Sequence, residues 1–189
     1  MLEWVDSDGV RVAAYLIATA VALAMWAREH HRVRSTPSLW PGFWLLTAAV
    51  FLAMAIGRAA DLGGLATEFG RSEARSQGWY NDRRRIQAVV IGLLGATWLV
   101  VVAVSLVKVP ARRRRYLPAA LAVFTLMCFV AIRLVSLHQV DSLLYRRQIA
   151  GAQVGTVVEL ALLAIAAALT AWPPPIHQRV DYVRPVAVR

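Results

Sequence analysis

Ionisable side chains interrupt apolar sequence at two places, and these residues could do chemistry. Asp141 lies three residues after His138, and Tyr145 lies four after Asp141. A continuous helix would therefore place all three on one face. A histidine hydrogen-bonded to a carboxylate serves as a general base, an oriented metal ligand or a pH-sensitive contact. A solvated helix end with an ordinary polar face would produce the same spacing.

Glu159 lies within the next apolar run. Counting 1.5 Å per residue from Ile149 puts it roughly 15 Å below the membrane surface. An ionised carboxylate at such a depth is costly and marks a functional site by default. We expect Arg133, inside the preceding run, to pair with it. A single buried ion pair that only fixes helix packing is the alternative interpretation.

Two further acidic residues, Asp61 and Glu73, lie between the second and third apolar runs. Asp61 is three residues after Arg58, a spacing that favours a local ion pair. A metal site needs three or four ligands, and only the fold could bring these two carboxylates to His138 and Asp141. His138 and Asp141 are therefore weak metal candidates, and no cofactor is predicted.

The same inter-run segment is rich in arginine and aromatic residues. Residues 66–77 carry charges at helical spacing, which predicts a short amphipathic helix lying on the membrane surface. The aromatic residues that follow this helix are expected to lie at the membrane–water interface, and the arginines after them are expected to contact anionic lipid headgroups. Charges that merely anchor the next span are the alternative. The candidates for lipid or anion binding are Trp79, Tyr80, Arg83, Arg84 and Arg85.

The elements that must position these residues are membrane-spanning helices. The chain has 189 residues, of which 59% are hydrophobic. A span takes about 20 mostly apolar residues, and the runs show no alternation typical of a barrel. We predict an all-α, five-helix transmembrane bundle as a single domain over 1–172, with a mobile cytoplasmic tail over 173–189. The predicted spans are 10–26, 39–59, 86–107, 117–138 and 149–172.

Arginine-rich loops predict the orientation of a multi-pass protein in the cell membrane. The first and third loops are short and basic, so both should be cytoplasmic. The acidic N-terminus then lies outside and the C-terminus lies in the cytoplasm. The second loop also carries arginines, which leaves the opposite orientation open. The polar residues named above would lie toward the outer side.

A net charge of +10 could indicate a protein that binds nucleic acid. Here the arginines fall between apolar runs, as expected of membrane loops held against anionic headgroups, so nucleic acid is not an expected partner. The expected partners are therefore membrane lipids with anionic headgroups, together with a homo-oligomer or a larger membrane complex. The sequence contains no Gly-x-Gly-x-x-Gly, Walker loop, His-Glu-x-x-His or Gly-x-Ser-x-Gly motif. Cys128 stands alone, which excludes an intrachain disulfide.

Three functions remain open on this basis. The first is binding or conduction of a proton or small ion, or service as an accessory subunit of a membrane complex. The second is an intramembrane enzyme acting on a lipid or lipid-linked substrate, with His138 and Asp141 as its acid-base or metal site. The third is a structural subunit whose charges only pack and orient it. Whether the protein is an enzyme is not decided by the sequence.

Overall fold

The computed structural model describes residues 7–32, 40–76, 83–135, 148–149 and 152–171. This part of the chain is helical apart from one two-residue ladder, so the predicted all-α class is confirmed. In chain order the elements are α1 (Asp8–Arg32), α2 (Pro41–Ala59), α3 (Leu62–Ser76), α4 (Arg83–Lys108), η3 (Ala111–Tyr116), α5 (Leu117–Val135), β1 (Gln148–Ile149), β2 (Ala152–Gln153) and α7 (Val154–Ala171).

Five helices in the described residues are long and apolar enough to cross a membrane: α1, α2, α4, α5 and α7. They correspond in order to the five predicted runs. The fifth helix differs at its start, because β1 pairs antiparallel with β2 before the helix begins. It therefore starts at Val154 rather than Ile149, which shortens the stretch of helix that precedes Glu159.

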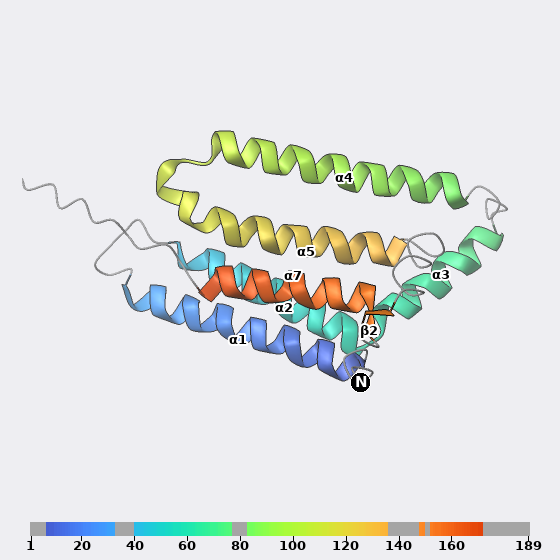
Figure 1. Ribbon diagram of the computed structural model, residues 1–189, viewed down its shortest axis with the longest axis horizontal. Helices are drawn as coiled ribbons and strands as arrows, with labels where there is room; N and C mark the ends of the chain where they lie inside the picture. Colours follow the sequence, from blue (N-terminus) through green and yellow to red (C-terminus); the bar gives the residue numbers. More distant parts are fainter. Residues whose placement is uncertain (1–6, 33–39, 77–82, 136–147, 150–151, 172–189) are drawn as a thin grey trace, which may run out of the picture.

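The long helices alternate in direction, so each end of the bundle collects particular helix ends (Figure 1). At one end α1, α4 and α7 begin, while α2 and α5 finish and α3 follows α2. We call this the Glu159 end. The opposite end is called the Glu29 end, after the other buried glutamate.

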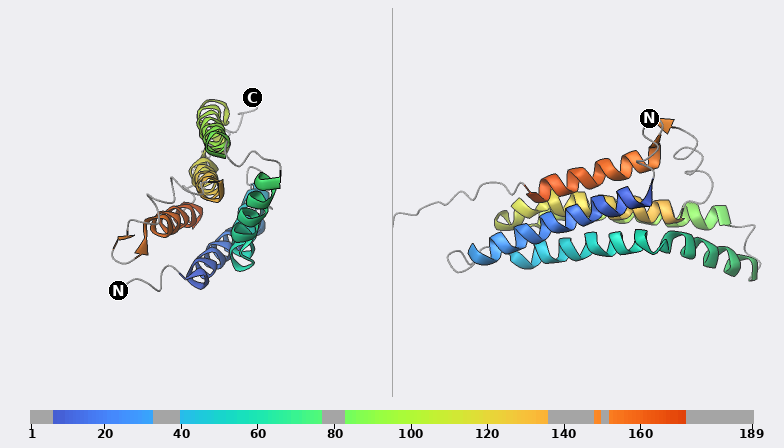
Figure 2. Two further views of the ribbon diagram at one scale, coloured as in Figure 1. Left: turned by 90° about the vertical axis from the view of Figure 1, so that its right-hand side faces the viewer. Right: turned by 90° about the horizontal axis from the view of Figure 1, so that it is seen from below.

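Four of the long helices form the packed core. α1 packs along α2 and against α7, and α7 packs in turn against α5 (Figure 2). Small residues at the contacts let the helix backbones approach closely, as is usual for membrane helices. The buried residues of the larger of two hydrophobic clusters are Tyr15, Ala18, Ala22, Ala48, Phe51, Ala55, Val123, Leu126, Leu163 and Ala166.

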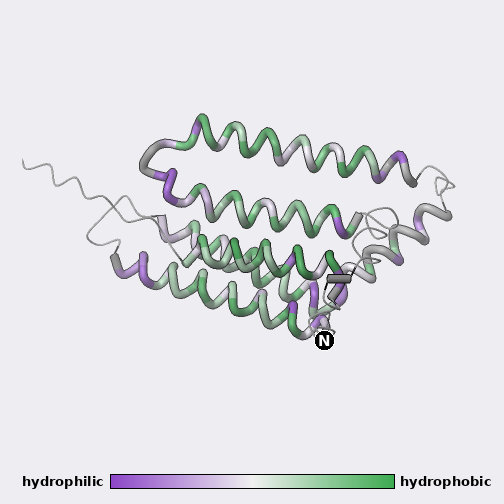
Figure 3. Tube along the Cα trace, in the orientation of Figure 1, coloured by the Kyte–Doolittle hydropathy of each residue, from purple (hydrophilic) through white to green (hydrophobic). Residues whose placement is uncertain are grey.

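Helix α4 lies outside this core. It packs along α5, and none of the residues in its most apolar window is buried. Figure 3 shows that α4 is hydrophobic along most of its length. Large side chains such as Leu93 and Leu99 are about three-fifths exposed. A surface this apolar is unfavourable in water, so the arrangement is consistent with a multi-pass membrane protein.

Helix α3 begins directly after α2 at a tight turn. Asp61 has a φ of 45°, a left-handed conformation that aspartate tolerates, and its Oδ1 accepts the Gly64 N–H at 3.2 Å. Gly63 brings α3 close to α5, since a Cβ there would lie 3.1 Å from Leu134 Cδ2. The predicted helix over 66–77 is thus present, but it begins earlier, at Leu62. Its place on a membrane surface stays a prediction.

Candidate functional site

Glu159 lies in the second turn of α7 and its side chain is fully buried. Counting 1.5 Å per residue from Val154 puts it only about 8 Å from the helix start. The predicted start of this helix at Ile149 was therefore wrong, because the ladder and not a helix precedes Val154. The depth of roughly 15 Å below the membrane surface stays a prediction. Glu159 shares its buried face with Thr156 and Leu163, so it faces protein rather than lipid.

Four hydrogen bonds hold the Glu159 carboxylate. The Tyr15 hydroxyl donates to Oε1 at 2.9 Å, and Arg58 Nε donates to the same oxygen at 3.2 Å. Arg58 Nη2 donates to Oε2 at 2.6 Å, and Arg133 Nη1 donates to it at 2.5 Å. A carboxylate accepts about four hydrogen bonds in all. The acceptor capacity of Glu159 is therefore filled.

The four side chains come from four different helices. Tyr15 belongs to α1, Arg58 to α2, Arg133 to α5 and Glu159 to α7. The ion pair between Arg133 and Glu159 that the sequence predicted is present. Sequence reasoning missed Arg58, which was expected to pair with Asp61, and it missed Tyr15 altogether. The available signal was that each is a polar group in or beside an apolar run, at the same end of the bundle.

A cavity of about 500 Å³ lies beside this cluster, between α2 and α5. Its volume falls within the range of about 300–1,000 Å³ that small-molecule sites occupy. The wall is apolar over most of its length and is made by residues such as Val50, Met54, Met127, Val130 and Leu134. The polar or charged side chains that line it are Tyr15, Arg58 and Asp61.

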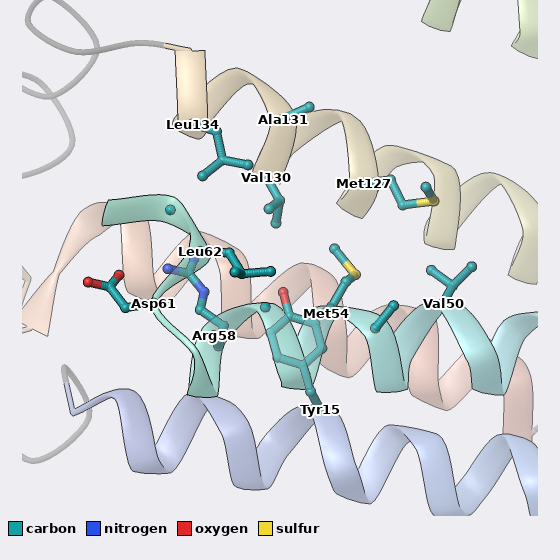
Figure 4. A pocket seen from close by; sticks show the side chains of 13 residues that line it. Tyr15, Val50, Met54, Arg58, Asp61, Leu62, Met127, Val130, Ala131 and Leu134 are labelled. Atoms are coloured by element: carbon teal, nitrogen blue, oxygen red, sulfur yellow. The ribbon is translucent and has the colours of Figure 1, made fainter. Parts of the chain in front are cut away.

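Figure 4 shows how these groups are arranged. Tyr15 points from α1 into the space between α2 and α5, while Arg58 rises from the last turn of α2. The Asp61 carboxylate stands beyond Arg58, at the turn into α3. The Arg58 side chain is 23% exposed, whereas that of Arg133 is 6% exposed. Arg58 is therefore the arginine of the cluster that a molecule in the cavity could reach.

Comparisons with protein-family models, curated proteins and solved structures find no match to this chain.

The other predicted site residues are distributed as follows. Asp61 lines the cavity with Arg58, but its oxygen also caps α3. Glu73 lies three turns further along α3, about 18 Å from Asp61 by the helical rise, and does not line the cavity. Arg85 is exposed near the start of α4. Arg83 and Arg84 form the first turn of that helix, and their side chains lie outside the described part.

Several predicted residues cannot be compared with the fold. His138, Asp141, Tyr145, Trp79 and Tyr80 all lie outside the described residues. Within the described residues, no three His, Cys, Asp or Glu side chains come together as a metal site would require. The weak metal prediction at His138 and Asp141 is left untested by this.

A second buried glutamate, Glu29, organises the opposite end of the bundle. Arg115 Nη2 donates to its Oε1 at 3.1 Å, and the Tyr116 hydroxyl donates to its Oε2 at 3.0 Å. That hydroxyl also accepts a hydrogen bond from the backbone N–H of Trp40 at 2.9 Å and a short one from Arg115 Nη2. The Phe43 and Trp44 rings pack on Tyr116 at centroid distances of 5.1 and 5.6 Å. These contacts join α1, the start of α2 and η3.

Proposed function

We propose that this multi-pass membrane protein binds an amphiphile, a molecule with an apolar chain and a polar head, in the cavity between α2 and α5. The observation that carries the proposal is the distribution of polarity along the cavity. The described residues of its wall are apolar except at one end, where Arg58, Tyr15 and Asp61 gather. An apolar chain would pack along the wall, and the head would meet the polar end.

The direction of the cavity supports this proposal. On α2 the lining runs from Arg58, in the last turn, back to Val50. The helical rise makes this about 12 Å. On α5 it runs from Leu134, next to the helix end, back to Met127. The polar part thus lies near the bundle end and the apolar part lies deeper, as a lipid lies in its leaflet.

We further propose that the Glu159 end faces outward. The Glu29 end carries Arg28, Arg32, Lys108, Arg113 and Arg114, and basic residues next to spans favour the cytoplasmic side. Helix α3 would then lie at the outer interface, and the C-terminus would be cytoplasmic. The amphiphile would come from the outer leaflet.

The geometry speaks against a proton relay through Glu159. A relay needs a carboxylate that can exchange partners, but the hydroxyl of Tyr15 and the guanidinium groups of Arg58 and Arg133 already fill the acceptor positions of this one. The four hydrogen bonds also fix the carboxylate in place. An enzymatic function would depend on His138 and Asp141, and it stays a prediction, as does the role of an accessory subunit.

Photoaffinity labelling tests binding in the cavity. Detergent-purified protein is exposed to two probes that each carry a diazirine on an alkyl chain, one a fatty acid and one the corresponding alcohol. We expect at least one probe to label peptides that contain Met54 or Met127. Ala131→Phe should fill the cavity and abolish this labelling.

The matched control is Ala103→Phe, which adds the same ring to the exposed surface of α4 and should leave labelling unchanged. Ala53→Phe provides a second cavity variant at an exposed lining position, where the added ring is less disruptive to folding. Thermal unfolding shows whether each variant is folded. Equal labelling of wild type and both folded cavity variants, or labelling spread along α4, would refute the proposed function.

A further inference from the structure

The four packed helices form an open group rather than a closed ring. Among the described helices, the extensive contacts run from α2 to α1, from α1 to α7 and from α7 to α5. Helix α4 packs on the far side of α5, away from α2 (Figure 2). The helices α2 and α5 are therefore the two edges of the group, and the cavity lies between these edges.

Aromatic rings join the two edges at the Glu29 end. The rings of Phe43 and Trp44, in the first turn of α2, pack on the ring of Tyr116 at centroid distances of 5.1 and 5.6 Å. Tyr116 directly precedes α5. The described lining of the cavity extends in this direction only to Val50 and Met127. The gap between α2 and α5 is therefore closed beyond the deep end of the cavity.

The start of α3 joins the two edges again at the Glu159 end. Leu62 and Gly63 lie in the first turn of α3, and both line the cavity. The Leu62 side chain extends into the space between α2 and α5 (Figure 4). A Cβ at Gly63 would lie 3.1 Å from Leu134 Cδ2, so the backbone of α3 comes close to the end of α5. We call residues 61–64 the roof of the cavity, because they cover its polar end.

Between the roof and the aromatic rings, the cavity has one buried side and one open side. Tyr15 of α1 belongs to the buried side, because it lines the cavity and is only 1% exposed. On the open side Ala53 of α2 is exposed, and Met127 of α5 is 43% exposed. Both residues are apolar and belong to helices that are apolar enough to span a membrane. In a membrane, this lateral opening would therefore face lipid.

We infer that the ligand is a membrane lipid that enters the cavity sideways from the bilayer, through the lateral opening between α2 and α5, with its head beneath the roof. The inference rests on the proposed function, because it specifies how the same cavity is filled. Along this path the lipid keeps its chain out of water, whereas a path past the roof would expose the chain.

The lateral opening also bears on which lipids fit. From Arg58 to Val50 the cavity is about 12 Å long by the helical rise. An extended chain of sixteen carbons is roughly 20 Å long, given C–C bonds of about 1.5 Å. Because the deep end is closed and the side is open, the end of such a chain would leave the cavity near Met127 and remain in the bilayer.

The test blocks each of the two paths by cross-linking, in protein reconstituted into lipid nanodiscs. Cys128→Ala first removes the only cysteine of the chain. In this background, Ala53→Cys with Met127→Cys places thiols on the two edges of the lateral opening. Gly63→Cys with Leu134→Cys places thiols on the roof and on α5, and the smaller side chain at position 134 leaves space for the one added at position 63. A short bismaleimide bridges each pair, and mass spectrometry verifies the bridge.

The two diazirine probes, the fatty acid and the alcohol, are added to the nanodiscs after bridging. The measurement is the saturable labelling of peptides that contain Met54, which excess unlabelled probe analogue suppresses. We expect a bridge across the lateral opening to abolish this labelling and a bridge on the roof to leave it unchanged. When the probe is added before the lateral opening is bridged, labelling should persist after a chase with the analogue, because the probe is trapped.

The same variants without the bismaleimide are the matched controls, and thermal unfolding shows whether they are folded. Loss of labelling on bridging the roof, or no loss on bridging the lateral opening, would overturn the inference but not the proposed function. No saturable labelling of the wild type with either probe would overturn both.

A second measurement needs no cysteine variant. A hexadecanol probe with its diazirine at the end of the chain should saturably label peptides that contain Met127, where the chain leaves the cavity. Saturable labelling of Phe43 or Trp44 by this probe would show that the chain continues inside the bundle, and it would overturn the lateral path.

Discussion

The two ends of the bundle use the same three residue types, glutamate, arginine and tyrosine, in different ways. At the Glu29 end, Arg115 and Tyr116 are consecutive residues, and both contact one carboxylate. At the Glu159 end, the partners come from three separate helices. The first arrangement attaches one segment to α1. The second ties α1, α2 and α5 to α7.

The surroundings of the two clusters differ as well. The aromatic rings of Phe43 and Trp44 pack on the phenol that binds Glu29. Beside Glu159 the helices leave a cavity of about 500 Å³. A cluster with balanced charge and filled surroundings is suited to holding helices together. A cluster that lies beside a cavity is also suited to holding a ligand.

The largest expected effect separates the two glutamates. Glu159→Gln would turn an amide N–H₂ toward groups that already donate, and it would remove the fully buried carboxylate charge that both Arg58 and Arg133 contact. We expect it to lower the free energy of unfolding by about 3–5 kcal/mol. Glu29→Gln loses one charge pair and can still accept from Arg115, so we expect about 1–3 kcal/mol. Thermal unfolding in mild detergent measures both, and an equal loss would break the distinction between the ends.

A smaller effect should distinguish the two arginines that contact Glu159. Arg133 is the more buried, and its removal leaves a space inside the bundle. We expect Arg133→Gln to cost about 2–3 kcal/mol of unfolding free energy, because a hydrogen bond to a buried charge is lost. Arg58→Gln should cost about 1 kcal/mol, since its partly exposed end can be solvated. If Arg58→Gln proved the more destabilising, Arg58 would be chiefly a structural residue.

Some of this arrangement could be predicted from the sequence, and particular residues show why the rest could not. Long apolar runs predict membrane-spanning helices, so the five helices followed from hydropathy, and the Arg133–Glu159 contact followed from opposite charges in consecutive runs. Tyr15 and Arg58 were missed because their partner is more than one hundred residues away in sequence. The spacing of residues within a short segment cannot indicate a contact over such a distance in sequence. For Arg58, the three-residue spacing instead favoured an ion pair with Asp61.

The start of α7 shows a different limit. Gln148–Ile149 and Ala152–Gln153 form a ladder in a segment that hydropathy alone assigned to the span. Only the pairing of the two strands shows that the helix begins later. The Glu29 cluster was missed for another reason. A glutamate among basic residues resembles an ordinary solvated loop charge, and its burial depends on how η3 packs against α1.

The two tyrosines should differ in the opposite order to the glutamates. Tyr116→Phe removes a hydroxyl that donates to Glu29 and also accepts the Trp40 N–H and an Arg115 N–H. We expect it to cost about 1–2 kcal/mol of unfolding free energy. Tyr15→Phe removes one donor from an oxygen that Arg58 still contacts, and we expect about 1 kcal/mol or less. Paired thermal unfolding curves test the order, and a larger loss for Tyr15→Phe would mean that its hydroxyl helps to set the geometry of the arginines.

The smallest effect concerns Thr156, one turn before Glu159 on the same buried face. Its hydroxyl oxygen is fully buried and has no hydrogen-bond partner among the described residues. A buried polar group without a partner costs free energy, so an apolar group of the same shape should be tolerated or preferred. Thr156→Val should therefore leave the unfolding free energy unchanged or raise it by up to about 1 kcal/mol, as measured by thermal unfolding. A clear loss of stability would show that the hydroxyl is engaged, and the polar cluster would then extend along α7 beyond the four residues that now define it.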